Sequence, residues 1–381
     1  MRSVFALFSA PVFVCAIACV SQTVLAAEMI VVGQSVPLSG ANASFGRDVR
    51  TGALAHFGAV NALGGINGRL IELRSLDDAN DAKRSGENTR LLLNDPRVVA
   101  LFGYGSATLS APAVPQAQAA GVAFVAPFTG ADRMRQSSEV VFNIRASYTD
   151  EIAEFMRVMG SYQKRVAVVH YDDAVGKENL ATAQKTLTAK SDVEIVSIAL
   201  TRNRENVAAA AEQISNSELG VVLLTILSSP GAELVKAVRI ANKNMPMFGA
   251  ISFTSSSHLS RALAATRSDT GRYGVAVSSV VPDPRSSVMP AALEYQAAMR
   301  RFYPGELLSL TGFESFLAAK MLTSGFRKTS VINRRTVLDA LGSITELDLG
   351  GYVVKWPQSN RYGSRYVELF LIRGPDTFSQ L

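Results

Sequence analysis

Glycine-rich stretches are the first candidates for chemistry, because main-chain N–H groups in such loops can hold a phosphate. The stretch NALGGING, residues 61–68, is either a phosphate cradle or a turn between a helix and a strand. The stretch YDDAVGKEN contains Gly176-Lys177, the pair that ends a Walker loop. However, Tyr171 stands where the first glycine belongs and Glu178 where a hydroxyl belongs, which disfavours a nucleotide triphosphate site.

A third phosphate candidate, FGYGSATLS, follows an apolar run. Gly103 and Gly105 fit the start of a dinucleotide-binding fingerprint, but Thr108 replaces the third glycine. No acidic residue lies at the distance beyond it that ribose binding requires. The sequence therefore gives little support for a bound nucleotide, and no cofactor is expected.

Catalytic and metal-binding groups are equally sparse. His56, His170 and His258 are far apart in sequence, none has the spacing of a metal ligand, and His56 is expected at the surface. There is no Gly-x-Ser-x-Gly elbow, and the acids of SLDDAND, which follow a predicted strand, are more typical of turns and caps than of an acid–base pair. We therefore expect neither an enzyme nor a metal site.

The first 26 residues differ from the rest of the chain. Arg2 gives a positively charged N-terminal region, and an apolar stretch runs from Val4 to Val20. Val24 and Ala26 then offer the small residues of a signal-peptidase cleavage site. This order is typical of a secretory signal cleaved near Ala26, and a membrane anchor is the alternative. We expect export to the periplasm.

Both cysteines, Cys15 and Cys19, lie in this segment, so a mature chain that starts at Ala27 forms no disulfide. A lipoprotein signal is disfavoured, because neither cysteine has a leucine three residues before it. After residue 27 no apolar run is long enough to span a bilayer. We expect the mature chain to be a soluble globular protein.

The composition favours more than one folded domain and no nucleic-acid partner. The chain has 381 residues, of which 48% are hydrophobic and 18% charged, which allows sizeable cores and is unlike a disordered chain. The formal net charge is +6, but the lysines and arginines are scattered. Binding of nucleic acid usually needs a concentrated basic tract, which is missing here.

The pattern around the glycine run predicts a helix, a turn and a strand. Apolar residues recur at steps of three and four, which indicates one face of an amphipathic helix. They are Val49, Ala53, Phe57, Val60 and Leu63. Gly64-Gly65 is expected to end this helix and Asn67-Gly68 to form a tight turn before the strand RLIELRSL.

Apolar strands alternate with helices in two series, the second of which starts near residue 150. Continuous apolar strands separated by helices are typical of parallel sheets covered on both faces. We therefore predict an α/β fold with two doubly wound parallel-sheet lobes. A helical region from about Pro290 to Gly342 follows, and then a hairpin made by LGGYVVKW and RYVELFLI.

A set of motifs in the first hundred residues carries a family resemblance. In order, they are Leu38-Ser39-Gly40, Gly46, NALGGING at 61–68 and Asp77-Asp78. Together they resemble the periplasmic solute-binding proteins for leucine, isoleucine and valine, which have the type I periplasmic binding fold. The resemblance continues through VVALFGYGSAT, VAFVAPFTGA, VFNIRASYTDE and VAVVHYDDAVG, and weakly to the C-terminal hairpin.

The resemblance implies a receptor with two α/β lobes, a ligand in the cleft between them and no role for NALGGING in phosphate binding. Such proteins deliver solute to an ABC permease in the inner membrane, and this one is expected to be a monomer. A ligand-sensing module of a regulatory system is the alternative. The family's three-strand hinge implies lobe 1 at 27–146 plus 283–348 and lobe 2 at 147–282 plus 349–381. The expected crossings are Arg145–Tyr148, Ser278–Pro282 and Leu347–Gly351.

The resemblance also implies a ligand site in the loops after the strands of lobe 1. In the family, hydroxyls and main-chain N–H groups of the loop after VVALFG hold a ligand carboxylate, and Ser106 and Thr108 match this loop. The alternative for these two residues is a plain helix cap. The loop APFTG after the next strand contributes Phe128 and Thr129. Loops after neighbouring parallel strands lie at one edge of a sheet, so we expect these residues to converge.

Two further residues match family positions that face the ligand. Phe45 precedes the glycine of the first loop and either covers the ligand or packs in the core. Tyr148 lies at the first expected crossing, where its hydroxyl is expected to face the cleft.

The sequence departs from the family pattern in the second lobe. Val175 stands where the family has an aromatic residue, and no acid occurs from Gly249 to Ser257, where the family places a Glu for the ligand ammonium. A buried ammonium without a carboxylate is costly. The solute is therefore an amine-free carboxylate, or an amino acid whose ammonium meets another acid such as Asp173 or Glu314.

Overall fold

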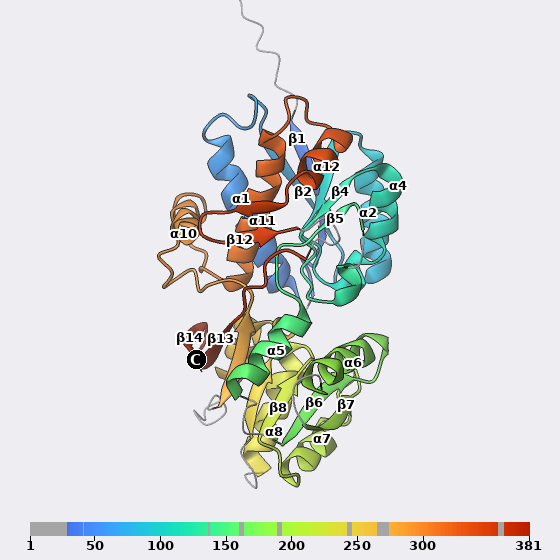
Figure 1. The fold of residues 1–381 in the computed structure, drawn as a ribbon, viewed down its shortest axis with the longest axis vertical. Helices are drawn as coiled ribbons and strands as arrows, with labels where there is room; N and C mark the ends of the chain where they lie inside the picture. The colour runs from blue at the N-terminus through green and yellow to red at the C-terminus, as the bar shows by residue number, and fades with distance from the viewer. Residues whose placement is uncertain are drawn as a thin grey trace, which may run out of the picture.

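The protein forms two α/β lobes, one above the other in Figure 1. The computed structural model describes residues 29–40, 42–135, 138–159, 164–188, 193–241, 246–264, 274–356 and 362–381. The expected signal segment and its cleavage site lie outside these residues. Within the described part of the chain, no helix is both long enough and apolar enough to cross a membrane.

Lobe 1 is built on a sheet of five parallel strands in the order β2-β1-β3-β4-β5. The strands are β1 (Ile30–Val36), β2 (Ile71–Asp77), β3 (Val98–Phe102), β4 (Ala123–Val125) and β5 (Val141–Phe142). Because β1 pairs with β2 on one side and β3 on the other, the chain changes direction across the sheet at β1 and β3. Ligands of open α/β sheets usually sit beyond the strand ends at such a point.

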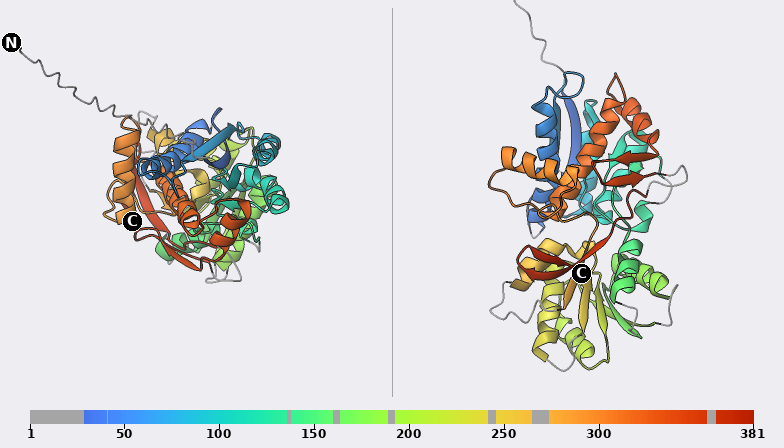
Figure 2. Two further views of the ribbon diagram at one scale, coloured as in Figure 1. Left: turned by 90° about the horizontal axis from the view of Figure 1, so that it is seen from above. Right: turned by 60° about the vertical axis from the view of Figure 1, so that its left-hand side comes forward.

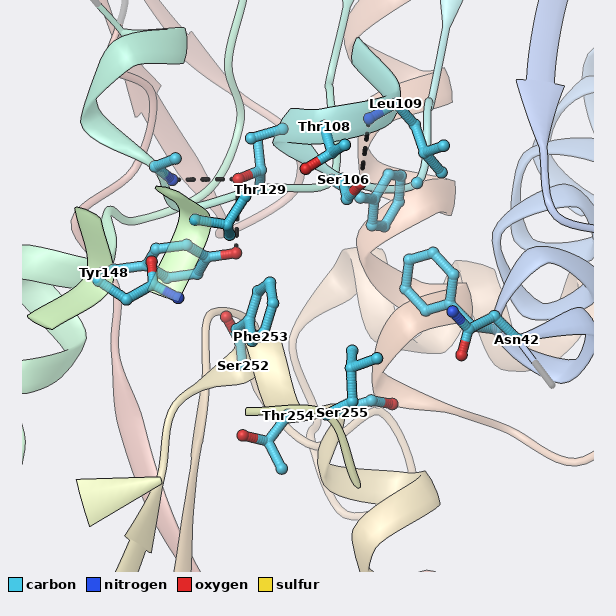
Figure 3. Close-up of a pocket in the computed structure, with 18 of the residues that line it drawn as sticks. Asn42, Ser106, Thr108, Leu109, Thr129, Tyr148, Ser252, Phe253, Thr254 and Ser255 are labelled. Atoms are coloured by element: carbon cyan, nitrogen blue, oxygen red, sulfur yellow. Dashed lines mark hydrogen bonds between the residues drawn. The ribbon is translucent and has the colours of Figure 1, made fainter. Parts of the chain in front are cut away.

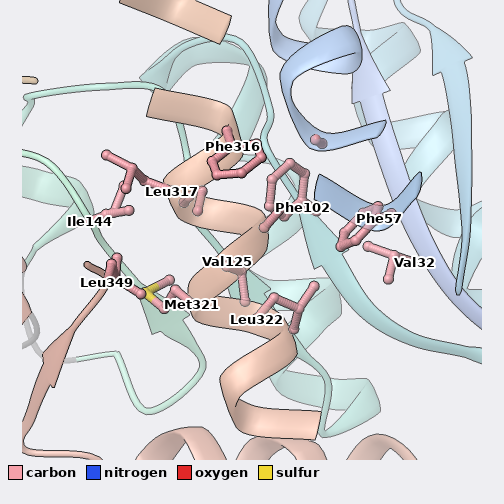
Figure 4. Close-up of a cluster of buried hydrophobic side chains, with 14 of the residues drawn as sticks. Val32, Phe57, Phe102, Val125, Ile144, Phe316, Leu317, Met321, Leu322 and Leu349 are labelled. Atoms are coloured by element: carbon pink, nitrogen blue, oxygen red, sulfur yellow. The ribbon is translucent and has the colours of Figure 1, made fainter. Parts of the chain in front are cut away.

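Helices cover both faces of this sheet. They are α1 (Ala43–Asn61), α2 (Ala82–Asn94), α3 (Ala107–Ser110), α4 (Ala113–Ala120), α10 (Pro290–Phe302), α11 (Leu310–Arg327) and α12 (Arg334–Gly342). The helix α11 is apolar on most sides and buried along most of its length. Figure 4 shows its Phe316 and Leu322 near Phe102 of β3 and Phe57 of α1, in the main core of lobe 1.

Lobe 2 is built on a seven-stranded sheet in the order β14-β13-β10-β9-β8-β6-β7. Its strands are β6 (Arg165–Tyr171), β7 (Glu194–Leu200), β8 (Val221–Leu224), β9 (Met247–Ala250), β10 (Val275–Ser279), β13 (Glu368–Gly374) and β14 (Thr377–Gln380). All of them pair in parallel except β13 and β14, which are antiparallel to their neighbours. The helices are α5 (Tyr148–Met159), α6 (Ala174–Thr188), α7 (Val207–Ser215), α8 (Ser228–Ala241) and α9 (Ser256–Ala264). The predicted class of two parallel-sheet lobes is confirmed.

The glycine run at 61–68 is the helix end and turn that the sequence predicts. Gly65 has a φ of 77° and Gly68 a φ of 76°, in the left-handed region where glycine is favoured. A Cβ on Gly65 would lie 2.0 Å from the carbonyl oxygen of Arg69, so the backbone approaches itself closely there. Asn61, the last residue of α1, bonds through its side chain to both the N–H and the C=O of Ile71 at 2.8 Å.

The acids of SLDDAND are turn and cap residues, as predicted. Asp77 accepts the N–H of Leu38 at 2.8 Å and the hydroxyl of Ser39 at 2.6 Å, which ties the first loop to the end of β2. Asp81 is the N-cap of α2 and accepts the N–H of Arg84 at 2.7 Å.

The part of the chain that the structure describes passes between the lobes three times. The first passage lies between β5 and α5, at residues 143–147, and the second follows β10, at residues 280–283. The third lies later than the sequence analysis placed it. Trp356 still donates its N–H to the carbonyl of Thr345 in lobe 1, at 2.7 Å, and Glu368 already pairs with Ser279 in lobe 2.

The segment after residue 349 therefore belongs first to lobe 1, which corrects the expected boundary and the expected hairpin. The strands β11 (Glu346–Asp348) and β12 (Val353–Lys355) pair with each other, because Asp348 accepts the N–H groups of Gly350 and Gly351 in a tight turn. Trp356 then donates to the carbonyl of Asn143 at 2.9 Å. Figure 2 shows β13 and β14 in the other lobe, where they pair with each other and with β10.

His56 is buried, so the expectation of a surface role is wrong. It is 6% exposed, and its Nε2 lies 2.8 Å from the hydroxyl of Thr323 in α11. Its ring meets Phe316 edge to face at 5.1 Å. Burial, together with the positive charges of Arg327 and Lys320, lowers the pKa of His56 to about 3.

We expect Gly65→Ala to destabilise lobe 1 more than Gly68→Ala does. Each substitution costs about 1–2 kcal/mol for an alanine with left-handed backbone. At Gly65 the added Cβ also forces a backbone shift, which costs about 1–3 kcal/mol more, whereas Gly68 has no atom within 4 Å of that position. Urea unfolding of both variants measures the difference, and equal losses would contradict the close approach to Arg69.

We also expect His56 to make the protein less stable as the pH falls from 6.5 towards 3. The folded protein holds this group neutral down to a pKa of about 3, while the unfolded chain protonates near 6.5, so acid favours unfolding. The unfolding free energy should fall by at most about 1.4 kcal/mol per pH unit from this group. His56→Gln, which keeps a donor for Thr323, should show a shallower slope in urea titrations over the same range; an unchanged slope would refute the assignment.

Candidate ligand-binding site

A cavity of about 320 Å³ lies between the lobes and is called here the cleft cavity. It is lined by loops after β1, β3 and β4 of lobe 1 and after β6, β8 and β9 of lobe 2. The carboxyl ends of the strands of both sheets therefore face one space. Its volume is near the lower end of the range of small-molecule sites, about 300–1,000 Å³.

All six residues expected from the sequence line the cleft cavity. They are Phe45, Ser106, Thr108, Phe128, Thr129 and Tyr148, most of which are labelled in Figure 3. The strands β3 and β4 are neighbours in the sheet, so the loops after them meet at one edge. Parallel pairing is the physical reason why residues more than twenty positions apart in sequence converge here.

Two hydroxyl-bearing residues lie at the start of α3. Ser106 is the N-cap of this one-turn helix, and its Oγ accepts the N–H of Leu109 at 3.2 Å. The alternative of a helix cap is therefore correct for Ser106, although the residue also lines the cavity. The first N–H groups of a helix have no intrahelical acceptor, so those of Ala107 and Thr108 face the same end as the two hydroxyls.

Thr129 and Tyr148 form a second polar group that lines the cleft cavity. The hydroxyl of Thr129 donates to that of Tyr148 at 3.4 Å and accepts the N–H of Ala131 at 3.1 Å, as the dashed lines of Figure 3 mark. Both side chains are buried, and burial raises the pKa of Tyr148 above its usual value. The tyrosine is therefore a neutral hydrogen-bond donor at neutral pH.

Aromatic rings form much of the apolar wall. Phe45 and Phe128 meet edge to face at 5.9 Å in lobe 1. In lobe 2, Phe253 lies edge to face on Tyr148 at 6.1 Å. The sequence analysis missed Phe253, whose only signal was its position after a predicted strand in the region where an acid was sought. Val175 also lines the cavity, which leaves this part of the wall apolar.

An ion pair joins the two lobes across the cleft cavity. Arg133 of lobe 1 lies 2.5 Å from Glu178 of α6 in lobe 2, and both residues line the cavity. Glu178 is the one carboxylate among the described lining residues. Asp173, an acid considered for a ligand ammonium, instead pairs with Arg202 at 2.7 Å and is not among the lining residues.

A buried ionic cluster lies where the chain first passes between the lobes. Arg145 contacts Glu151 of lobe 2 and Glu314 of lobe 1, each at 3.5 Å, and hydrogen-bonds to the hydroxyl of Ser252. The two carboxylates and the guanidinium are all at least nine-tenths buried. Burial raises the pKa of Glu314, while the charge of Arg145 opposes this rise.

Comparison with known proteins identifies the family. A family model described as "Periplasmic binding protein" matches residues 29–367. The chain belongs to the periplasmic binding protein family. The resemblance to its leucine-, isoleucine- and valine-binding branch is confirmed, and members of this family are solute-binding proteins rather than enzymes.

Individual relatives agree with this assignment. An amino acid binding protein of Pseudomonas aeruginosa is 29% identical over 55% of this chain and 57% of its own length. The chain thus matches little more than half the length of this curated relative. A possible leucine/isoleucine/valine-binding protein from Rhodopirellula baltica is 26% identical, with a TM-score of 0.84 over 94% of this chain and 98% of that one. A substrate-binding periplasmic protein from Ralstonia solanacearum is 28% identical, with a TM-score of 0.82 over 92% and 100%.

The described residues include no group of three or more histidine, cysteine, aspartate or glutamate side chains placed to hold a metal ion. The three histidines lie apart in the structure as well. His56 bonds to Thr323 in lobe 1, His170 lies in β6 beside Ser197, and His258 lies between Ser255 and Ser44 at the cleft.

We expect Arg133→Gln to shift this periplasmic binding protein towards a more open cleft. A partly exposed ion pair is worth about 0.2–1 kcal/mol, so the ratio of closed to open forms should fall by up to about fivefold. Energy transfer between dyes on Lys83→Cys of lobe 1 and Glu212→Cys of lobe 2 measures this change. High salt should shrink the difference.

The matched control is Arg204→Gln, which breaks a pair with Glu233 at 3.8 Å that lies entirely within lobe 2. Its energy transfer should equal that of the parent protein. Equal transfer efficiencies in all three proteins would show that the Arg133–Glu178 pair does not hold the lobes together.

Proposed function

We propose that this protein is a periplasmic receptor that captures a small carboxylate-bearing solute in the cleft cavity and delivers it to an ABC permease. The observation that supports the proposal is that three hydroxyl-bearing residues, Ser106, Thr108 and Thr129, line the same cavity as the hydroxyl of Tyr148, to which Thr129 donates. Adjacent N–H groups at the start of α3 add further donors. Such a donor set suits a carboxylate without needing an arginine.

The rest of the cavity suits a compact apolar body. Phe45, Phe128 and Phe253 offer ring faces and edges, and Val175 and Leu227 add aliphatic surface. The amino acid binding protein of Pseudomonas aeruginosa supports an amino acid as solute. The absence of an unpaired acid among the described residues that line the cleft cavity supports an amine-free carboxylate. Both classes share the carboxylate that the hydroxyls receive.

Capture in such a cleft works by hinge motion. The three chain passages between the lobes let the lobes move as units, so a solute that contacts both lobes favours the closed form. The closed form then presents a surface that an empty receptor lacks, which a permease can recognise. We infer that the receptor acts as a monomer, because one chain supplies both walls of the cavity.

We expect Ser106→Ala and Thr129→Ala each to weaken carboxylate binding about 10- to 150-fold. A hydrogen bond to a charged group contributes about 1.5–3 kcal/mol, and about 1.4 kcal/mol is tenfold in affinity. The carboxylate is chosen by a thermal-shift screen, since ligand binding raises the apparent stability, and calorimetric titration then gives the affinity of each variant.

Ser110→Ala is the matched control. Ser110 lies in the same short helix as Thr108, its hydroxyl is buried without a partner among the described residues, and it does not line the cavity. Its affinity should stay at the parent value. If Ser106→Ala and Thr129→Ala also bind like the parent, the two hydroxyls serve only the fold and the carboxylate site is elsewhere.

A further inference from the structure

The end of lobe 1 that points away from lobe 2 carries a surface that takes no part in the cleft cavity. The carboxyl ends of the strands of lobe 1 face the cleft, so their amino ends lie at this opposite end, where β1 begins (Figure 1). Two turns meet there, residues 62–70 between α1 and β2 and residues 327–333 at the end of α11. We call this surface the lobe 1 pole and define it by Leu63, Leu70, Arg327, Lys328 and Val331.

Hydrogen bonds hold the two turns of the pole together. The side-chain amide of Asn67 donates to the carbonyls of Thr329 and Ser330, at 3.2 and 3.4 Å. The guanidinium of Arg69 donates to the carbonyl of Ile332 at 3.3 Å. The backbone of the pole is therefore fixed by the fold, and so are the positions from which its side chains project.

Large aliphatic side chains are exposed on the pole. Leu63 is 87% exposed, Val331 60% and Leu70 42%. Single exposed aliphatic residues are ordinary in a soluble domain, but a group of them on one surface marks a site of interaction. The pole therefore offers apolar area to a partner.

The same two turns are strongly basic. The stretches 61–70 and 327–336 contain no acidic residue and five basic ones, Arg69, Arg327, Lys328, Arg334 and Arg335. Two acids lie close by: Asp339 pairs with Arg335, and Asp95 pairs with Arg74 and Arg97. Basic residues at the end of α11 also suit the helix dipole, but this explains neither the lack of acids nor the exposed aliphatic residues. A partner of this surface is expected to be anionic and partly apolar.

The chain enters lobe 1 beside the pole. The carbonyl of Met29, the first described residue, accepts a hydrogen bond from Arg69 at 3.4 Å. The apolar stretch from Val4 to Val20, typical of a secretory signal and otherwise of a membrane anchor, ends nine positions before Met29. At ~3.3–3.6 Å per residue, this connection spans at most about 30 Å. While the stretch is in a membrane, the pole is therefore the part of lobe 1 that lies nearest the lipid.

We propose that the lobe 1 pole binds the surface of a membrane that contains anionic lipids. Leu63 and Val331 enter the headgroup region, and Arg327 and Lys328 lie against lipid phosphates. Insertion of apolar groups and attraction of basic groups act together in binding of this kind. The cleft cavity is at the other end of lobe 1, so docking leaves it uncovered. The inference goes beyond the proposed function and does not depend on it.

The test is sedimentation of the mature chain, which starts at Ala27, with phosphatidylcholine vesicles that either contain or lack phosphatidylglycerol. The chain should bind the anionic vesicles, less so in high salt, and bind the neutral vesicles far more weakly. Leu63→Ser combined with Val331→Ser should weaken the binding about tenfold or more. Arg327→Gln combined with Lys328→Gln should weaken it about 25-fold, which is about fivefold for each charge.

Two controls match these variants in chemistry and differ in place. Ile240 of α8 in lobe 2 is 84% exposed, so Ile240→Ser removes an equally exposed aliphatic side chain. Lys83 and Arg84 are adjacent exposed residues at the start of α2, at the cleft end of lobe 1. Lys83→Gln combined with Arg84→Gln therefore removes the same two charges elsewhere. Both controls should bind anionic vesicles as the parent does.

Equal binding to the two kinds of vesicle, no binding to either, or equal losses in the controls would overturn the proposal. A dye on Ser330→Cys gives a second measurement that needs no change of the pole residues, because both natural cysteines lie ahead of Ala27. Its emission should shift to shorter wavelength with anionic vesicles, whereas the same dye on Glu212→Cys of lobe 2 should not respond. If the pole variants fail to fold, this comparison decides, and an unshifted dye at residue 330 would contradict docking. No solute is present in either assay, so the outcome is independent of the solute site.

Discussion

The guanidinium of Arg145 is the point at which the two lobes and the ligand cavity depend on one another. It lies at the first passage between the lobes, contacts a carboxylate from each of them and reaches the loop after β9 through Ser252. A buried charge is tolerated only when it is compensated, so the positions of Glu151 and Glu314 are coupled through this one group.

The ligand cavity follows from the topology of the two sheets. In each lobe the parallel strands end at the same edge, and the loops after them face the other lobe. Lobe 1 contributes hydroxyls, N–H groups and the rings of Phe45 and Phe128, and lobe 2 contributes Phe253, Val175 and Leu227. In the proposed function, the hydroxyls of lobe 1 bind the polar end of the solute, and aromatic rings from both lobes, Phe45, Phe128 and Phe253, cover its apolar body.

The sequence predicted what depends on local pattern and on pairing between neighbouring strands. Alternating apolar runs predicted the parallel sheets, and Gly65 and Gly68 predicted a turn because their backbone conformation suits glycine. His56 was misplaced because its environment is set by Thr323, 267 positions away. The third passage was misplaced because the turn at Asp348 to Gly351 pairs β12 antiparallel with β11. The segment RYVELFLI therefore pairs with β10 in the other lobe and not with β12. Nothing in the sequence indicated the ion pairs of Arg145 or the place of Phe253 in the cavity wall, because both depend on how the two lobes face each other.

Neither lobe is made from one continuous piece of chain, and this has a consequence for how the protein is made. The sheet of lobe 2 lacks β13 until residues 368–374 have been synthesised, and the core of lobe 1 lacks α11 until residues 310–327 have been. A growing chain therefore exposes an unpaired edge of β10 until residue 374 has been made, and an open face of the first sheet until residue 327 has been made. Contacts between such distant segments close large loops and slow folding. Neither lobe can therefore complete its fold before its late segment is made, although the two lobes are separate in space.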